Sequence, residues 1–276
     1  MAWQEVFFQY DGSFDGFLCC VYESYVHKEF PIAFCSDEEC YSLYDIRVIN
    51  TQMDHARRVY RSIFKRSSSA AQIVRRGFLT CLSDKESYLY AFIQKLFTGD
   101  TAFFHNLSDP VYYPLHRALR HMSGELEKLR GFIRFSDFGG VLGAEIEPQN
   151  RVLPLLRQHF CNRYANEKFF IYDRTNHDLL MYENGRSKIL QVTNFQMADP
   201  TEDEQLYRTL WKRFHNTIAI KERYNPRCQN TFMPKRYRST MTEFLPIAPQ
   251  TIPTDLHEAL QDSGVPVSIP ELGIHQ

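Results

Sequence analysis

Residues 109–146, DPVYYPLHRALRHMSGELEKLRGFIRFSDFGGVLGAEI, decide the fold. The first part of this stretch has apolar residues at the three- and four-residue spacing of one helical face; they are Leu115, Leu119, Met122, Leu126 and Leu129. We expect Asp109-Pro110 to start this helix and Gly131 to end it. Segments 132–135 and 141–146, on either side of Asp137-Phe138-Gly139-Gly140, then predict the two strands of a hairpin.

The same alternation of helices and short strands extends in both directions along the chain. Towards the N-terminus we expect strands at 5–10, 31–35 and 44–49, and helices at 13–25 and 52–66. Ser83-Asp84-Lys85-Glu86 matches a capping box before a third helix, which Gly99 should stop. Towards the C-terminus we expect a helix at 153–164, a hairpin at 169–173 and 179–182, and a helix from Asp199-Pro200-Thr201-Glu202 through Ile220.

These segments predict an α+β protein, with a helix-rich N-terminal half followed by antiparallel β-hairpins packed with helices. Residues 1–245 have the length of a single large domain, which could divide into two lobes near residue 107. Residues 246–276 are rich in proline and acidic, with few large apolar groups. We therefore expect them to form a disordered tail.

Composition limits the compartment and the cofactors. No apolar run is long enough to cross a membrane, and the first residues lack the basic and apolar design of a signal peptide. The seven cysteines include the neighbours Cys19 and Cys20, so we expect a cytoplasmic protein with reduced and mostly buried thiols. Cys35 and Cys40 have no second pair to complete a metal site, and no cofactor-binding motif is found.

Charge is strongly segregated, although the net charge is only −1. The segment from Trp211 to Thr240 contains eight Lys/Arg residues and one acid, Glu222. Residues 55–76 form a second basic segment without any acid. Such blocks resist burial and favour a surface that meets an anion, and interleaved aromatic rings suit nucleic acid. The plainer alternative is a solvated helix end and basic loop. The predicted nucleic-acid-binding residues are Lys221, Arg223, Tyr224, Asn225, Arg227, Lys235, Arg236 and Tyr237.

Two further places could carry chemistry. Asp11, Ser13 and Asp15 lie at a strand-to-helix turn, where the two carboxylates could bind a metal or act as acid and base. The same residues are also ordinary in turns and helix caps. Arg134 lies in the predicted strand at 132–135, where it could bind an anion or pair with an acid such as Glu145 or Glu147.

Several blocks resemble a known bacterial family. The blocks are IKERYNPRCQNTFMPKRY at 220–237 with TEF at 242–244, YDGSFDGFLCCVYESY at 10–25, RGFIRF at 130–135 and LPLLRQHFCNRY at 153–164. They are similar to an uncharacterised family described as probable DNA metabolism or putative DNA repair proteins. Its members accompany a radical SAM protein of presumed DNA modification or repair function, and some relatives are joined to a uracil-DNA glycosylase domain.

This sequence departs from the family at Arg238-Ser239-Thr240-Met241, where a Trp and a second bulky aromatic are usual, and it contains no glycosylase motif. The resemblance, together with the basic segment, implies an accessory protein that binds DNA or another nucleic acid and works with a radical SAM partner. Two alternatives remain open. One is a hydrolase or other enzyme acting on nucleic acid or nucleotide, centred on Asp11-Gly12-Ser13. The other is a protein-binding adaptor with a basic surface.

Overall fold

The computed structural model describes residues 3–36, 43–99, 101–193 and 195–245. About 51% of it is helical and 17% is strand, in two small sheets with helices, which confirms the α+β class. The predicted tail at 246–276 lies outside the described residues, and the division into two lobes near residue 107 stays a prediction.

The N-terminal part is a small parallel sheet covered by helices. Strands β1 (Gln4–Gln9), β2 (Glu29–Cys35) and β3 (Ile46–Val48) form it in the order β2-β1-β3, and β1 pairs in parallel with both neighbours. Helix α1 (Phe14–His27) makes the crossover from β1 to β2. Helices α2 (Met53–Arg66), α3 (Ser68–Gly77) and α4 (Lys85–Phe97) pack against these elements around Phe8, Phe17 and Phe92.

The predicted elements of this half are all present, but the start of α4 differs from its prediction. Asp84 takes a left-handed conformation (φ 52°) as the N-cap residue, and its side chain makes no cap hydrogen bond. The capping box at residues 83–86 is therefore wrong, because the N-cap residue is Asp84 and not Ser83, and no side chain caps the helix. Gly99, with φ 94°, follows the end of the helix as expected.

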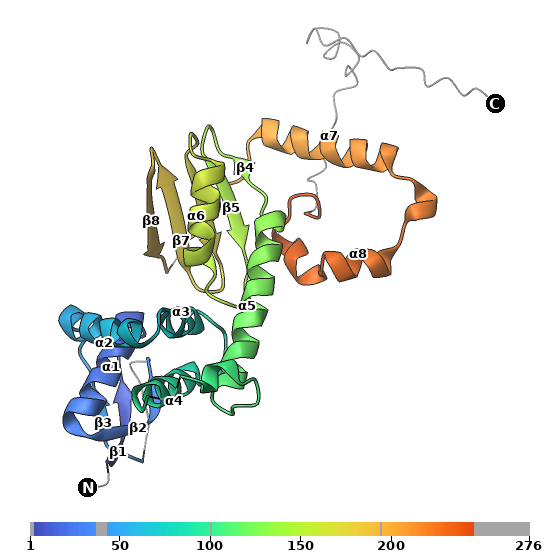
Figure 1. Ribbon diagram of the computed structural model, residues 1–276. Helices are drawn as coiled ribbons and strands as arrows, with labels where there is room; N and C mark the ends of the chain where they lie inside the picture. The colour runs from blue at the N-terminus through green and yellow to red at the C-terminus, as the bar shows by residue number, and fades with distance from the viewer. Residues whose placement is uncertain (1–2, 37–42, 100, 194, 246–276) are drawn as a thin grey trace.

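Helix α5 (Tyr112–Phe132) connects the two halves of the molecule (Figure 1). One Asp109 oxygen accepts from the backbone N–H groups of Val111 (2.9 Å) and Tyr112 (3.0 Å), which confirms the predicted start. Leu115 belongs to the first core, whereas Met122, Leu126 and Leu129 belong to the second. Gly131 does not end the helix, which continues to Phe132.

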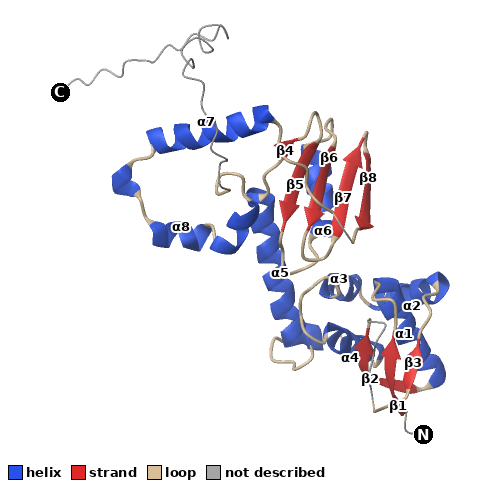
Figure 2. Cartoon of the chain, turned by 180° about the vertical axis from the view of Figure 1, so that it is seen from behind, coloured by secondary structure: helices blue, strands red, loops and turns tan. Residues whose placement is uncertain are grey.

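The second sheet has five strands in the order β4-β5-β6-β7-β8. They are β4 (Ser136–Asp137), β5 (Leu142–Ile146), β6 (Phe169–Asp173), β7 (Asp178–Glu183) and β8 (Arg186–Gln191). The hairpins β4–β5 and β6–β7 are antiparallel as predicted. The expected strand at 132–135 is wrong, because α5 continues to Phe132 and β4 begins only at Ser136. However, β5 and β6 pair in parallel, because α6 (Leu153–Arg163) carries the chain back between them. Helix α6 covers one face of the sheet (Figure 2).

Strand β8 is absent from the sequence prediction. It pairs antiparallel with β7 through Asn184 (φ 50°) and Gly185 (φ 77°), which both take left-handed conformations. Asn-Gly between two strands is the strongest short signal for such a hairpin. The polar composition of the strand, RSKILQ, hides it from a search for apolar alternation.

The C-terminal part forms an arm. Helix α7 (Glu202–Ile218) begins at the Thr201 cap as predicted but ends before Ile220. The 3-10 turn η2 (Lys221–Arg223) and helix α8 (Pro226–Phe232) follow, and η3 (Lys235–Thr240) brings the chain back beside α5 (Figures 1 and 2). None of α7, η2 and α8 contains a buried residue, whereas Tyr237 and Met241 lie in the second core.

Two other expectations can be compared with the structure. Cys35 is disulfide-bonded, and Cys81 and Cys228 are exposed, so the expectation of reduced and mostly buried thiols is wrong in part. Within the described ranges, the helices are too short or too polar to cross a membrane.

The buried carboxylate of Glu125 joins α5 to two other segments. Its side chain accepts hydrogen bonds from the backbone N–H groups of Gln149 (3.0 Å) and Asn150 (2.9 Å) and from the Asn150 amide (2.7 Å). Arg236 Nη2 of η3 lies 3.5 Å from the same carboxylate. Glu125 is only 2% exposed, so these donors replace the water that the charge has lost.

We predict that Glu125→Ala lowers the free energy of unfolding by about 3 kcal/mol or more, because three donors and a guanidinium lose their common acceptor. Glu127→Ala on the same helix is the control, since Glu127 is exposed and its ion pair among the described residues is with Arg130, one turn along the helix. Its effect should stay within about 0.5 kcal/mol. Urea unfolding measures both, and equal stability of the two variants would contradict the anchoring role of Glu125.

A second buried carboxylate, Asp173, lies at the end of β6 opposite Asp178 of β7. Burial and the charge of Asp178 raise the pKa of Asp173 to about 6, although hydrogen bonds from Asn176 and Thr175 oppose the shift. Asp178 is held by Arg151 through two hydrogen bonds of 2.6 and 2.8 Å. Within the described residues, Asp173 therefore forms no ion pair of its own.

The raised pKa predicts a stability that falls as pH rises. An acid with a pKa of about 6 in the folded protein and 3.8 otherwise binds its proton more tightly when folded, so its contribution is complete below about pH 4 and is lost as pH rises through 6. The loss amounts to about 3 kcal/mol at 1.36 kcal/mol per pKa unit. Unfolding free energies at pH 4 and pH 7 should show this dependence reduced in Asp173→Asn and unchanged in the exposed control Asp54→Asn. A dependence that Asp173→Asn retains in full would contradict the assignment.

Candidate nucleic-acid interface

The arm bends at residues 215–229, which we call the elbow. The end of α7, the turn η2 and the start of α8 enclose a hollow of about 620 Å³ there. Asn225 fixes the second bend, because its side-chain oxygen accepts from the backbone N–H of Cys228 (3.0 Å) and Pro226 occupies the first turn of α8. Local capping thus shapes the hollow without any support from the core.

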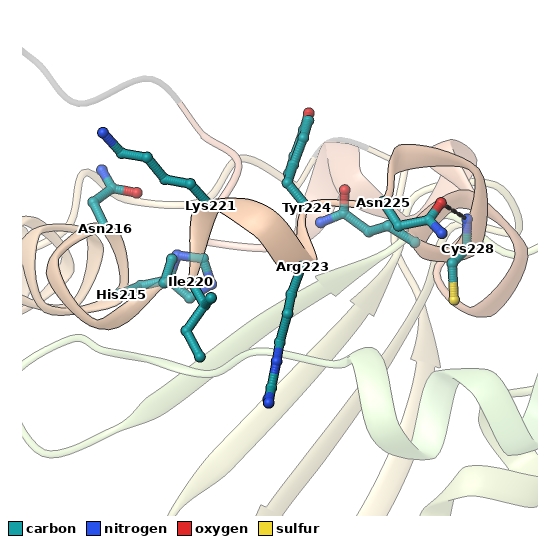
Figure 3. Close-up of a pocket in the computed structure, with 10 residues that line it drawn as sticks. His215, Asn216, Ile220, Lys221, Arg223, Tyr224, Asn225 and Cys228 are labelled. Carbon is teal, nitrogen blue, oxygen red and sulfur yellow. Dashed lines mark hydrogen bonds between the residues drawn. The ribbon is translucent and has the colours of Figure 1, made fainter.

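The hollow is lined by cations and one tyrosine ring. Figure 3 shows Lys221 and Tyr224 extending to one side of the η2 backbone and Arg223 to the other. All three residues are exposed, and the ring of Tyr224 is 75% accessible. Arg227, also exposed, follows in the first turn of α8.

These cations are not neutralised within the described chain. Within the described residues, neither Lys221, Arg223 nor Arg227 makes a side-chain hydrogen bond or ion pair, and Glu222 is the only acid in the sequence between Glu204 and Glu243. Glu204 is bound to Arg208 at 2.8 Å. Unpaired, solvated cations beside an exposed ring can bind an anion with a planar group attached.

The structure separates the predicted residues at η3 from those at the elbow. Arg236 donates to Gln149 Oε1 (2.6 Å), bonds the Tyr237 hydroxyl and pairs with Glu125, so it anchors the arm. Tyr237 is 4% exposed and packs against Phe132 in the second core. Burial raises the pKa of the Tyr237 hydroxyl, and the hydrogen bond and charge of Arg236 offset part of this rise. The prediction that Tyr237 offers a stacking face is therefore wrong.

Of the remaining predicted residues, Lys235 is exposed and Asn225 uses its side-chain oxygen as a helix cap. Arg134 is not in a strand. It lies in the loop after α5 and pairs with Glu243 (2.9 Å) while donating to the Gly131 carbonyl (2.8 Å). Arg134 therefore pairs with an acid, which was one of the two roles expected for it. Its partner is Glu243, so the expected partners Glu145 and Glu147 are wrong.

The turn at Asp11 and Ser13 is built as a helix cap. One Asp11 oxygen accepts from the Ser13 N–H (2.9 Å) and hydroxyl (2.7 Å), the other accepts from Thr51 (2.7 Å), and Ser13 caps α1 at Gly16. Burial opposes ionisation, but these hydrogen bonds outweigh it and lower the pKa of Asp11. Across the described residues, no three His, Cys, Asp or Glu side chains gather as a metal site would require.

The sequence predicted the helix α7 but not whether its apolar side is covered. The structure leaves Tyr207 70%, Trp211 58% and Phe214 54% exposed. Periodicity alone predicts an apolar face and cannot say what covers it. The signal that could have separated the two cases is Arg208, Lys212 and Arg213, which interrupt the apolar positions.

The sequence profile of a family described as DUF4130, a domain of unknown function, matches residues 83–243. This match covers more than half of the 276 residues, and the chain therefore belongs to this family. The matched region begins at the start of α4 and ends at Glu243, the partner of Arg134, so it includes the elbow and η3. No curated protein and no solved structure matches the chain.

The two adjacent cations of η3 should respond differently to truncation. Arg236→Ala should lower the unfolding free energy by about 2 kcal/mol, because it leaves Glu125 without its cation and removes a hydrogen bond to Gln149. Lys235→Ala should change it by less than about 0.5 kcal/mol, since Lys235 is exposed. Denaturant melts of the two variants test this, and a stable Arg236→Ala protein would remove Arg236 from the anchor.

Proposed function

We propose that this protein binds nucleic acid at the elbow. The observation that carries the proposal is the set of unpaired, exposed cations around the 620 Å³ hollow, with Tyr224 beside them. Phosphates contribute most of the affinity in such complexes, because bound cations release the counterions of the strand. Lys221, Arg223 and Arg227 would bind phosphates.

Exposed rings supply the second half of the interface. Tyr224 and Phe232 are each 75% exposed, at the two ends of the elbow-to-α8 segment. Bases stack on such rings with little sequence preference, at about 1–3 kcal/mol per base. Because single strands expose their bases for stacking, we expect the elbow to prefer single-stranded over duplex DNA.

The role within DNA metabolism is an accessory one in this proposal. It rests on the resemblance of residues 10–25, 130–135, 153–164 and 220–244 to proteins that accompany a radical SAM enzyme. That enzyme would supply the chemistry, and this protein would hold the nucleic acid. A cytoplasmic location fits this role, although the disulfide at Cys35 is unusual there.

A protein-binding adaptor is the second candidate, and α7 is the observation that favours it. Its exposed Trp211 and Phe214 lie against each other with ring centroids 5.9 Å apart, on a helix with no buried residue. Such a face is typical of a surface that a protein partner covers. The enzyme alternative gains no such support, because capping accounts for the hydrogen bonds of Asp11 and Ser13.

The salt dependence of DNA binding tests the elbow. Each phosphate contact contributes about −0.7 to the slope of log affinity against log salt on single strands and about −0.9 on duplex. A variant with Lys221, Arg223 and Arg227 changed to Ala should therefore lose about two units of slope on a single-stranded oligonucleotide. Fluorescence anisotropy between 50 and 200 mM salt measures it.

The matched control changes Arg157, Arg186 and Lys188 to Ala, since these exposed residues lie on α6 and β8, away from the arm. Its slope should remain within about half a unit of the wild type. Equal slopes for the elbow variant and the wild type would reject the elbow as the site. No binding at any salt concentration would reject nucleic-acid binding and favour the adaptor.

A further inference from the structure

The second basic segment, residues 55–76, contributes to a cavity that the elbow proposal does not use. Helices α1, α2 and α3 surround a cavity of about 320 Å³. Arg57 and Arg61, one helical turn apart on α2, line it together with Arg75 of α3. We call it the arginine cavity.

The three arginines differ from their neighbours in the same segment. Arg66 donates to the Leu96 carbonyl (3.1 Å), Arg76 donates to Ser123 (3.1 Å), and Arg58 lies over the Tyr22 ring. In contrast, Arg61 and Arg75 form no ion pair within the described residues. Arg57 has only a 3.9 Å contact to Asp54, whose side chain is 96% exposed.

The arginines with packing contacts are thus distinct from the arginines that line the cavity. An ordinary solvated basic face would point its charges apart, since like charges repel. Here arginines from two helices line one cavity, and a single acidic residue, Asp15, shares its lining. The cavity therefore has an excess of positive charge that an anion would neutralise.

The cavity also has an aromatic wall. Phe14 of α1 and Tyr60 of α2 line it, and their rings pack edge to face with centroids 6.2 Å apart. The Phe14 ring also packs against the Phe78 ring, with centroids 5.4 Å apart. Both Phe14 and Tyr60 remain partly accessible, so a planar group could lie against them.

We infer that the arginine cavity binds a nucleoside phosphate. Arg57, Arg61 and Arg75 hold the phosphate, because guanidinium groups bind phosphate oxygens through paired hydrogen bonds. The base lies against Phe14 and Tyr60, and the volume is at the small end of the range for ligand pockets. The inference does not rest on the elbow, because the residues of the two sites do not overlap.

The ligand could be a free nucleotide or one nucleotide of a strand, and the experiment separates these sources. AMP, inorganic phosphate and a 12-nucleotide single strand are titrated into the full chain at low salt by calorimetry. The protein carries Ala at Lys221, Arg223 and Arg227, so that elbow binding does not contribute. We expect AMP or the strand to bind, and inorganic phosphate to bind at least tenfold more weakly because it lacks the base.

In this background, Arg61→Ala with Arg75→Ala should weaken binding tenfold or more, since two charge-assisted contacts are lost. The matched control, Lys65→Ala with Arg157→Ala, removes the same charge from exposed positions outside the cavity and should change affinity less than twofold. Tyr60→Leu should reduce the preference for AMP or the strand over inorganic phosphate.

Binding of AMP identifies a free nucleotide as sufficient, and binding of the strand alone identifies the strand as the source. The inference is overturned if neither ligand binds, or if the control variant weakens binding as much as the cavity variant. Melting temperatures within a few degrees of the parent protein establish that the cavity variant is folded. If that variant unfolds, Arg61→Gln and Arg75→Gln replace it, because glutamine keeps the aliphatic stem and a polar end without the charge.

Discussion

The arrangement of the C-terminal half depends on the hydrogen bonds and the ion pair of the buried Glu125 carboxylate. This carboxylate lies on α5, the helix whose apolar seam serves both cores, and it binds the Gln149–Asn150 turn and Arg236 of η3 at once. A buried charge requires such partners, because it has given up water. The returning end of the arm is thereby fixed to the core, together with Tyr237 and Met241, while α7 and α8 project from it.

This anchoring explains why a basic segment that is continuous in sequence has two roles in space. Arg236 of this segment pairs with Glu125, and Arg134 from the loop after α5 pairs with Glu243, so both ion pairs hold the arm in place. The elbow cations lie between α7 and α8, which contain no buried residue, and within the described residues Lys221, Arg223 and Arg227 form no ion pair. The same residue types therefore stabilise the fold at one end and remain available to a ligand at the other.

The sequence predicted the elements better than their connections. Apolar periodicity located α1, α2, α5 and α6, since burial of one helical face imposes that spacing. It did not reveal the parallel pairing of β5 with β6, because pairing direction depends on where α6 packs. Charge and aromatic content correctly indicated exposed cations at Lys221 and Arg223. The burial of Tyr237 could not be predicted, because Phe132, its neighbour in space, is 105 residues away in the sequence.

The central claim is that the elbow, and not the anchored end of the arm, contacts nucleic acid. Ultraviolet crosslinking of a bound single strand, followed by peptide mapping, tests it most directly. The account predicts crosslinks at residues 215–229, with Tyr224 the main site because its ring is the accessible one in the hollow. Crosslinks confined to residues 233–243, or spread over β8 and α6 without the elbow, would contradict it.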